Sequence, residues 1–182
     1  MNHANHYLLF DRIQIQAANA ISGPLSYGFP SLNGFLGAIH ALNRRLPESD
    51  SITLGGVLVA CHDCDVQMYR PHAFADATFN QSRNPLKKNG DTASIIEEGK
   101  VHLTVSLLVE VHKADQAWAN LSQNQQASEW CQQVQNRLMQ QRIAGGSVTA
   151  IGRTQLFEPH QQDEMIAALL PAFVLMDAGH DL

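Results

Sequence analysis

The chain has 182 residues, of which 45% are hydrophobic and 16% are charged. This balance predicts one ordered domain around a single core and argues against a disordered chain. No run of about 18 apolar residues is present, and the start MNHANHY lacks the basic and apolar regions of a secretory signal. We therefore expect a cytoplasmic protein without membrane contact, and the odd count of three cysteines fits a reducing compartment.

The formal net charge of −5 argues against a nucleic-acid-binding protein, because proteins that neutralise several phosphates usually carry a basic surplus. The few cations are nevertheless clustered, so we expect local positive patches on an acidic molecule. The clusters are Arg44 with Arg45, then Arg83 with Lys87 and Lys88, then Arg137, Arg142 and Arg153.

The first quarter of the chain predicts a strand, a polar loop and a helix. Tyr7 to Gln16 alternates imperfectly between apolar and polar residues, which is typical of a strand buried mostly on one face. Glycines and prolines crowd residues 19–30 and predict a bent but well-defined loop. Ser31 is placed to cap a helix, and Gly34 and Gly37 would let that helix approach the sheet closely. The apolar face of the helix consists of Leu32, Phe35, Leu36, Ile39 and Leu42.

A long β-rich run occupies residues 52–69, and its glycine pair, Gly55 and Gly56, predicts a bend in a central strand. From 70 to 100 the regular pattern disappears, and a loop of this length in a compact domain is usually functional or disordered. Strand patterning returns at 101–111, where apolar residues on both sides predict a strand covered on both faces.

The last third predicts a second helix, a glycine turn with a short strand, a third helix and a final strand. Residues 121–141 form a mostly polar helix, and the glycine turn follows at 144–147. Asp163 is expected to cap a helix that runs to about Leu170 and precedes a strand at 172–176. The narrow apolar stripe of the second helix consists of Ala127, Trp130, Val134 and Leu138.

The order strand, helix, strand, strand, helix, strand predicts an α+β fold of the ferredoxin-like type, as in RNA-recognition modules. We expect an antiparallel sheet with helices on one face and a long inserted loop at about 70–100. The whole chain, residues 1–182, is expected to form a single domain.

One candidate RNA-binding segment lies within the long loop. It combines an aromatic ring for base stacking, amides for base edges and cations for phosphates, the mixture that single-stranded RNA recognition requires. The alternative is a solvated loop with an incidental aromatic residue. The residues concerned are Phe79, Asn80, Arg83, Asn84, Lys87 and Lys88.

The glycine turn is a second candidate. Gly145 and Gly146 lack side chains and Ser147 adds a hydroxyl, so backbone N–H groups can meet a phosphate closely beside Arg142. The alternative is a plain turn that ends the preceding helix. Two polar residues of the first loop are similar candidates, against the alternative of local side-chain turns: Asn19 and Ser22.

The run CHDC at residues 61–64 suggests a metal site, but it lacks a second ligand pair, since Cys131 stands alone on a predicted helix. Within a strand, its two cysteines would also point to opposite faces. We therefore expect no metal and no other cofactor. His40 lies on the first helix without an obvious catalytic partner, so we expect no catalytic residue.

Three separated blocks resemble, in the same order, the Csy-two family, the Cas-five-type RAMP subunit of the type I-F CRISPR surveillance complex. They span roughly residues 7–176 and read NAISGPLSYGFPSLNGFLGAIHAL, FNQSRNPLKKNGDTASIIEEGKVHLTVSLLVEVH, and RIAGGSV followed by LLPAFVLM. The resemblance implies a ferredoxin-like RAMP fold with a glycine-rich loop after the second helix, where Gly145 and Gly146 fall. Members of the family continue beyond an LLPAFVLM-like segment, so we expect this chain to be an N-terminal piece or a shortened variant.

The resemblance also implies a function. A member of this family would be a non-catalytic subunit that holds the 5′ handle of a CRISPR RNA and pairs with the large type I-F subunit and the backbone subunits. The candidate segments above would then contact RNA, and target DNA would be recognised indirectly through the guide. Two alternatives stay open. One is an endoribonuclease that processes the CRISPR RNA, because some RAMP relatives use a histidine as base, and the other is a protein-only adaptor, which the acidic balance would suit.

Overall fold

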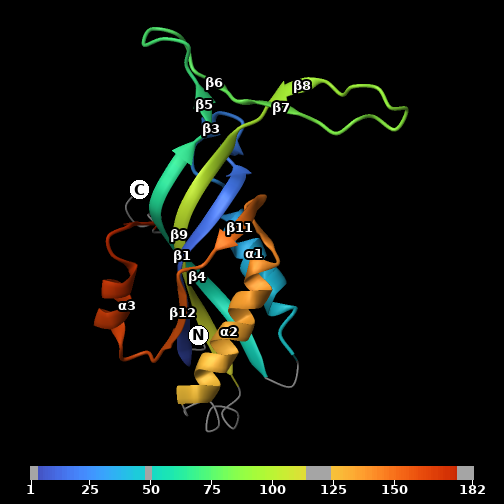
Figure 1. Cartoon of the computed structure of the whole chain (residues 1–182). Helices are drawn as coiled ribbons and strands as arrows, with labels where there is room; N and C mark the ends of the chain where they lie inside the picture. The colour runs from blue at the N-terminus through green and yellow to red at the C-terminus, as the bar shows by residue number, and fades with distance from the viewer. Residues whose placement is uncertain (1–3, 48–50, 114–123, 176–182) are drawn as a thin grey trace.

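The computed structural model describes residues 4–47, 51–113 and 124–175. Within these ranges the chain forms one seven-stranded sheet, three short hairpins and three helices (Figure 1). The helices are α1 (Asn33–Asn43), α2 (Asn124–Met139) and α3 (Gln162–Leu169). The strands of the sheet are β1 (His6–Asn19), β4 (Ile52–Val66), β9 (Lys100–Lys113), β10 (Arg142–Ile143), β11 (Gly146–Ala150), β12 (Arg153–Phe157) and β13 (Phe173–Val174).

The sheet has the strand order β10-β11-β1-β9-β4-β13, with β12 also paired to β1, and the pairings are antiparallel. In the chain, α1 lies between β1 and β4, and α2 lies between β9 and the β10–β11 hairpin. The predicted α+β class with an antiparallel sheet is confirmed. The prediction that residues 52–69 form a central strand is wrong, because β4 lies between β9 and the two-residue β13, whereas β1 and β9 occupy the centre.

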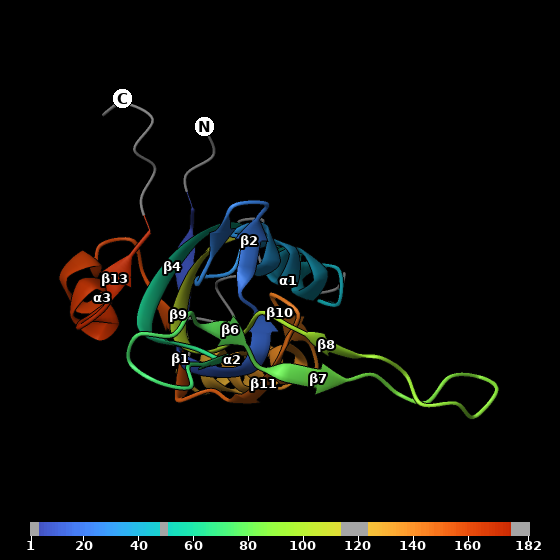
Figure 2. The ribbon, with the colours of Figure 1, turned by 90° about the horizontal axis from the view of Figure 1, so that it is seen from above.

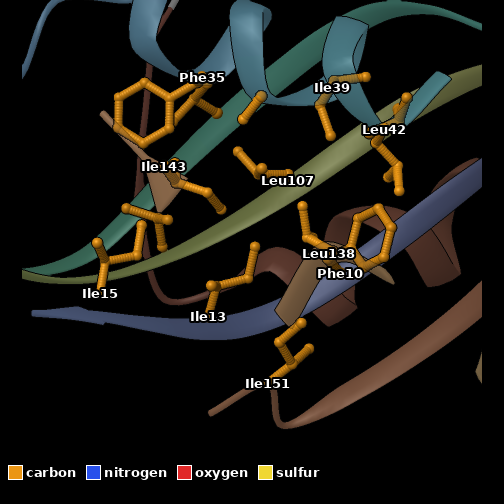
Figure 3. Packing of buried hydrophobic residues seen from close by; sticks show 14 of the residues in the cluster. Phe10, Ile13, Ile15, Phe35, Ile39, Leu42, Leu107, Leu138, Ile143 and Ile151 are labelled. Atoms are coloured by element: carbon orange, nitrogen blue, oxygen red, sulfur yellow. The ribbon is translucent and has the colours of Figure 1, made fainter. Parts of the chain in front are cut away.

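Helices cover both faces of the sheet, so the expectation that they lie on one face is wrong for α3 (Figure 1). α1 and α2 pack on one face, where Phe35, Ile39 and Leu138 meet the β-strand residues Phe10 and Leu107 in the main core (Figure 3). α3 covers the other face through a smaller cluster. Its buried residues are Leu9, Ala60, Phe157, Met165 and Leu169. The central strands carry apolar side chains on both faces, and α3 buries those that α1 and α2 do not reach.

Two β-bulges explain why the pattern of β1 alternates imperfectly. The register with β9 shifts between Phe10 and Ile13, where Arg12 has the positive φ of 47°. The extra residue keeps Phe10 and Ile13 on the same face, because a bulge reverses the alternation beyond it. A second shift follows at Ala17, which has φ 54°. The two bulges thus keep the apolar side chains of β1 facing the main core along the strand, where an unbroken alternation would turn them outward.

The predicted bend in β4 is present at the glycine pair. The register with β9 shifts between Leu54 and Val57, and the N–H of Gly56 donates to the Glu110 carboxylate at 2.9 Å. A Cβ added at Gly56 would lie 2.9 Å from that carboxylate oxygen, and one added at Gly55 would lie 2.7 Å from the His112 ring. A side chain at either position would therefore displace the ends of the Glu110 and His112 side chains on β9.

Most of the loop predicted at about 70–100 is irregular, as expected, but four short strands occur within residues 68–97. They form two hairpins, β5 (Met68–Tyr69) with β6 (Thr78–Phe79) and β7 (Gln81–Arg83) with β8 (Ile95–Glu97). Both project from one end of the sheet, and we refer to residues 68–97 as the arm (Figures 1 and 2). A third hairpin lies at the same end. It is formed by β2 (Ile21–Gly23) and β3 (Ser26–Tyr27) within the predicted first loop.

Both predicted helix caps are wrong. The N-cap position of α1 is Leu32, without a side-chain hydrogen bond, and Ser31 instead accepts the Gly34 N–H through its backbone carbonyl at 2.9 Å. The N-cap position of α3 is Gln161, so Asp163 lies inside the first turn, where its negative charge favours the helix dipole.

A buried polar network fastens the chain after α3 to the sheet. The Ser106 hydroxyl, fully buried on β9, donates to the Asp11 carboxylate at 2.9 Å and accepts the Arg12 N–H at 2.9 Å. The His62 ring lies between this hydroxyl, 2.7 Å from Nε2, and the Pro171 carbonyl, which accepts from Nδ1 at 2.9 Å. Three strands and the segment behind α3 are joined through one serine.

Candidate nucleic-acid interface

An open cleft of about 690 Å³ runs along α1, and we call it the α1 cleft. One wall is a stripe of α1 in which small residues recur at helical spacing. The opposite wall is the end of α2 and the β10–β11 turn. The lining residues are Asn19, Ser31, Asn33, Gly34, Gly37, Ala38, Ala41, Arg45, Gln140, Gln141, Arg142, Ala144 and Gly145.

The charge of the α1 cleft is opposite in sign to that of the whole chain. Arg45 and Arg142 line it, no Asp or Glu does, and the other polar lining groups are amides and a hydroxyl. Neither arginine has a carboxylate within 4.0 Å among residues 4–47, 51–113 and 124–175. Two unpaired guanidinium groups beside neutral hydrogen-bonding groups form a site suited to a polyanion.

A neighbouring hollow of about 430 Å³ shares Asn19, Arg142 and Gly145 with the cleft but has a mixed charge. Its other ionised residues are Glu97, Glu98 and Lys100. Hydrogen bonds from Lys100 and the Ser82 hydroxyl hold the pKa of Glu98 below its ordinary value. Lys100 is therefore already paired with Glu98, whereas Arg142 has no carboxylate partner in the described part of the chain.

The geometry of the α1 cleft depends on a tight turn. Ala144 and Gly145 connect β10 to β11 with φ 49° and 81°, the left-handed pair that a two-residue hairpin requires. The Ala144 carbonyl accepts the Asn19 N–H at 2.9 Å, and the Ala144 N–H donates to the Gly34 carbonyl at 3.4 Å. These bonds hold the end of β1, the start of α1 and the turn in one rigid arrangement.

The two glycines of α1 have different roles. A Cβ at Gly34 would lie 2.7 Å from Ala144 Cα, so the predicted close approach is confirmed there, against the β10–β11 turn. A Cβ at Gly37 would meet nothing within 4 Å, so the same prediction is wrong for Gly37, which faces the open cleft.

The structure brings only part of the predicted glycine site into the cleft. Arg142 and Gly145 line it, together with Asn19. Gly146 is buried, and a Cβ there would lie 2.5 Å from the Ile15 side chain, so its lack of a side chain has a packing reason. Ser147 is exposed beside Arg142 across the hairpin.

The other predicted residues lie on the hairpins at the same end of the sheet, outside the cleft lining. Ser22 hydrogen bonds with Ser26 within the β2–β3 hairpin. Phe79 is half-buried, and the exposed Asn80 uses its backbone to bond Gln67 and Glu98. The remaining four, all exposed, are on β7 or in the β7–β8 connection, which extends away from the sheet (Figure 2). They are Arg83, Asn84, Lys87 and Lys88.

Sequence reasoning missed most of the α1 wall. Arg45 was recognised only as one of a basic pair, and Asn33, Gln140 and Gln141 were not considered. The signal was present, because the small residues of α1 recur every three or four positions and lead to Arg45. His40 is exposed on α1 and is not among the cleft-lining residues.

The reason given against a metal site at residues 61–64 is partly wrong. A bulge between Cys61 and Asp63 places Cys61 opposite Val105 and Cys64 opposite Leu103, so the two cysteines share one face of the sheet. Burial and then the neighbouring Cys64 thiolate raise the pKa of Cys61. The described part of the chain holds no group of three or more His, Cys, Asp or Glu residues arranged for a metal.

The family model described as "CRISPR-associated protein (Cas_Csy2)" matches residues 8–182, which include every wall of the α1 cleft. The chain belongs to the Csy2 family. It is 45% identical over 141 residues to "CRISPR-associated protein Csy2" of Pseudomonas aeruginosa (strain UCBPP-PA14). That match covers 78% of this chain but 41% of the relative, so the chain spans less than half of that Csy2 protein.

The Csy2 family assignment confirms the family resemblance drawn from the three sequence blocks. Across the described ranges, none of the helices combines the length and apolar character needed to cross a bilayer.

Proposed function

We propose that this Csy2-family chain is a non-catalytic RNA-binding subunit of a type I-F CRISPR surveillance complex in the cytoplasm. It holds the 5′ handle of the CRISPR RNA and pairs with the large subunit and the backbone subunits, while target DNA is recognised through the guide. The observation that carries the proposal is the α1 cleft, where Arg45 and Arg142 have no carboxylate partner among residues 4–47, 51–113 and 124–175, in a protein of net charge −5.

A ferredoxin-like RAMP fold is the frame of this proposal. Taking β1, β4, β9 and β11 as its first to fourth strands gives the sheet order fourth, first, third, second, with helices after the first and third strands. This is the topology expected of a split βαβ unit. The remaining elements are additions to that frame within a single RAMP-like domain: the β2–β3 hairpin, the arm, β10, β12, α3 and β13.

The chemistry of the α1 cleft supports single-stranded RNA in particular. Guanidinium groups bind phosphate oxygens through two parallel hydrogen bonds, and amide side chains pair with base edges. In the cleft, Arg45 and Arg142 supply the guanidinium groups for phosphates. Asn33 and Gln140 supply the amides for base edges. The arm adds exposed cations at the same end of the sheet, so an RNA strand that leaves the cleft has further phosphate partners (Figure 2).

The proposal is tested by titrating the purified chain with fluorescent 5′-handle RNA over a range of salt concentrations. Replacing Arg45 and Arg142 together by Gln should weaken binding and reduce the slope of log affinity against log salt by about 1.4, since each lost phosphate contact on a single strand removes about 0.7. Arg44→Gln is the matched control, because Arg44 is exposed beside Arg45 but does not line the cleft. Equal binding of handle RNA and a scrambled strand would overturn the proposal.

A protein-only adaptor is the second candidate, favoured by the acidic net charge and by exposed apolar side chains on α3 and β13 such as Ile166 and Phe173. The same titration decides between the two, because an adaptor would bind handle RNA no better than a scrambled strand. Incubation with precursor CRISPR RNA in the absence of metal tests the endoribonuclease alternative, and specific cleavage products would contradict a non-catalytic role.

A further inference from the structure

The β2–β3 hairpin presents an aromatic ring that the proposed function does not yet use. Tyr27 is 62% exposed on β3. Its ring contacts Phe79 edge to face, with centroids 5.6 Å apart and planes at 87°. The two rings come from different hairpins, one before α1 and one in the arm, so the exposed ring is supported by a distant part of the chain.

Phe79 is itself fixed in place. It is half-buried, and a Cβ added at Gly99 would lie 3.3 Å from its ring and 2.7 Å from the Ile21 side chain. Ile21 in turn pairs with Tyr27 across the β2–β3 hairpin. Phe79 is therefore enclosed by Gly99, Ile21 and Tyr27, whereas Tyr27 leaves most of its own surface open to solvent. The sequence predicts Phe79 as a stacking residue, whereas the more exposed of the two rings is that of Tyr27.

The position of Tyr27 relative to the cationic groups is the second observation. Its strand partner Ile21 lines the smaller hollow together with Asn19, Arg142 and Gly145, and those three residues also line the α1 cleft. The β2–β3 hairpin that carries the Tyr27 ring therefore borders a hollow that Arg142 also lines. Alternating phosphate-binding and ring-stacking groups are the arrangement by which proteins hold single-stranded nucleic acid.

We infer that Tyr27 is the residue on which one nucleobase of the bound RNA strand stacks, with Phe79 as a positioning residue that holds the ring. The inference rests on the proposed RNA-binding function and adds a specific stacking site to it. A tyrosine suits this role because its ring is large and has few rotatable bonds, so little freedom is lost on binding.

The test uses the full chain and two kinds of handle RNA, one intact and one series with a single abasic site moved along the strand. Tyr27→Ser should weaken binding of intact RNA about tenfold, the effect of losing ~1.4 kcal/mol of base stacking. Tyr27→Phe retains the ring and should bind like the unaltered protein. Tyr69→Ser removes a ring with 60% exposure on β5 and should leave affinity unchanged.

The abasic series identifies stacking as the cause. One abasic position should weaken binding to the unaltered protein by about the same tenfold factor, and Tyr27→Ser should add no further loss on that strand. Phe79→Leu should follow Tyr27→Ser on intact RNA and show no effect on the same abasic strand, while Phe79→Tyr restores binding. A merely structural role for Phe79 would weaken both strands equally.

Binding of intact RNA by Tyr27→Ser within twofold of the unaltered protein would overturn the inference while leaving the proposed function in place. Equal losses for Tyr27→Ser on intact RNA and on every abasic strand would also overturn it. If the unaltered protein does not prefer handle RNA to a scrambled strand, the proposed function fails, and the stacking site fails with it.

Discussion

Polar side chains are used in opposite ways in two regions of this molecule. Under α3, a network joins the buried Asp11 and Ser106 to the half-buried His62, and its groups are bonded to one another and to backbone atoms. In the α1 cleft, Arg45 and Arg142 are held on rigid elements but are left without carboxylate partners among the described residues. The polar groups of the first region stabilise the fold, whereas those of the second remain available to bind a ligand.

The physical difference lies in burial. A buried hydroxyl or carboxylate without a partner costs free energy, so the network must be complete to be tolerated. Exposed guanidinium groups stay hydrated and cost little when unpaired. Changes in the network should therefore alter stability without altering RNA affinity, and changes in the cleft should do the reverse.

The largest expected effect is a loss of protein stability when the network of Asp11, Ser106 and His62 is broken. Ser106→Ala removes only the hydroxyl and leaves Asp11 and the Arg12 N–H without that partner, so we expect unfolding to become easier by about 3 kcal/mol. Urea denaturation measures this loss. Thr104→Val on the same strand is the control, since no hydrogen bond joins the Thr104 hydroxyl to another residue of the described ranges. Equal destabilisation by both variants would contradict the importance of the network.

The next largest expected effect is on stability, from matched alanine substitutions at the two glycines of α1. Gly34→Ala forces a methyl group to within 2.7 Å of Ala144 and should destabilise the protein by about 2 kcal/mol. Gly37→Ala meets open space and should stabilise it by up to about 1 kcal/mol, because alanine favours the helix. Thermal unfolding of the two variants compares them directly. The same sign for both changes would show that the turn does not fix the helix at Gly34.

The smallest expected effect is a change in RNA affinity when only the charge of the α1 cleft is altered. Gly37→Glu adds a carboxylate facing Arg45 and Arg142, and Gly37→Gln adds a side chain of the same shape without charge. We expect Gly37→Glu to bind handle RNA about fivefold more weakly than Gly37→Gln, which corresponds to about 1 kcal/mol, with equal melting temperatures. Equal affinity of the two variants would mean that RNA does not enter the cleft.

The elements of the frame were predictable because their signals are local. The apolar spacing of α1 and α2, the strands β1, β4 and β9, and the bend at Gly55 and Gly56 all depend on neighbours within a few residues. The hairpins of the arm were missed because each has strands of two or three residues, too short for an alternating pattern. The bulge at Arg12 was missed because a positive φ in an arginine has no local signature.

The candidate site was predictable only in its composition. Asn19, Arg142 and Gly145 were chosen as RNA-binding residues and now line one cleft, but nothing near them in the sequence indicates Arg45 as the second cation. The sequence by itself determined the family, the α+β class and the choice of candidate RNA-binding residues, because these follow from residue type and local spacing. Only the tertiary structure decided which of those residues meet, and which ring stays exposed. Both depend on contacts between segments far apart in the chain, such as Gly34 with Ala144 and Tyr27 with Phe79.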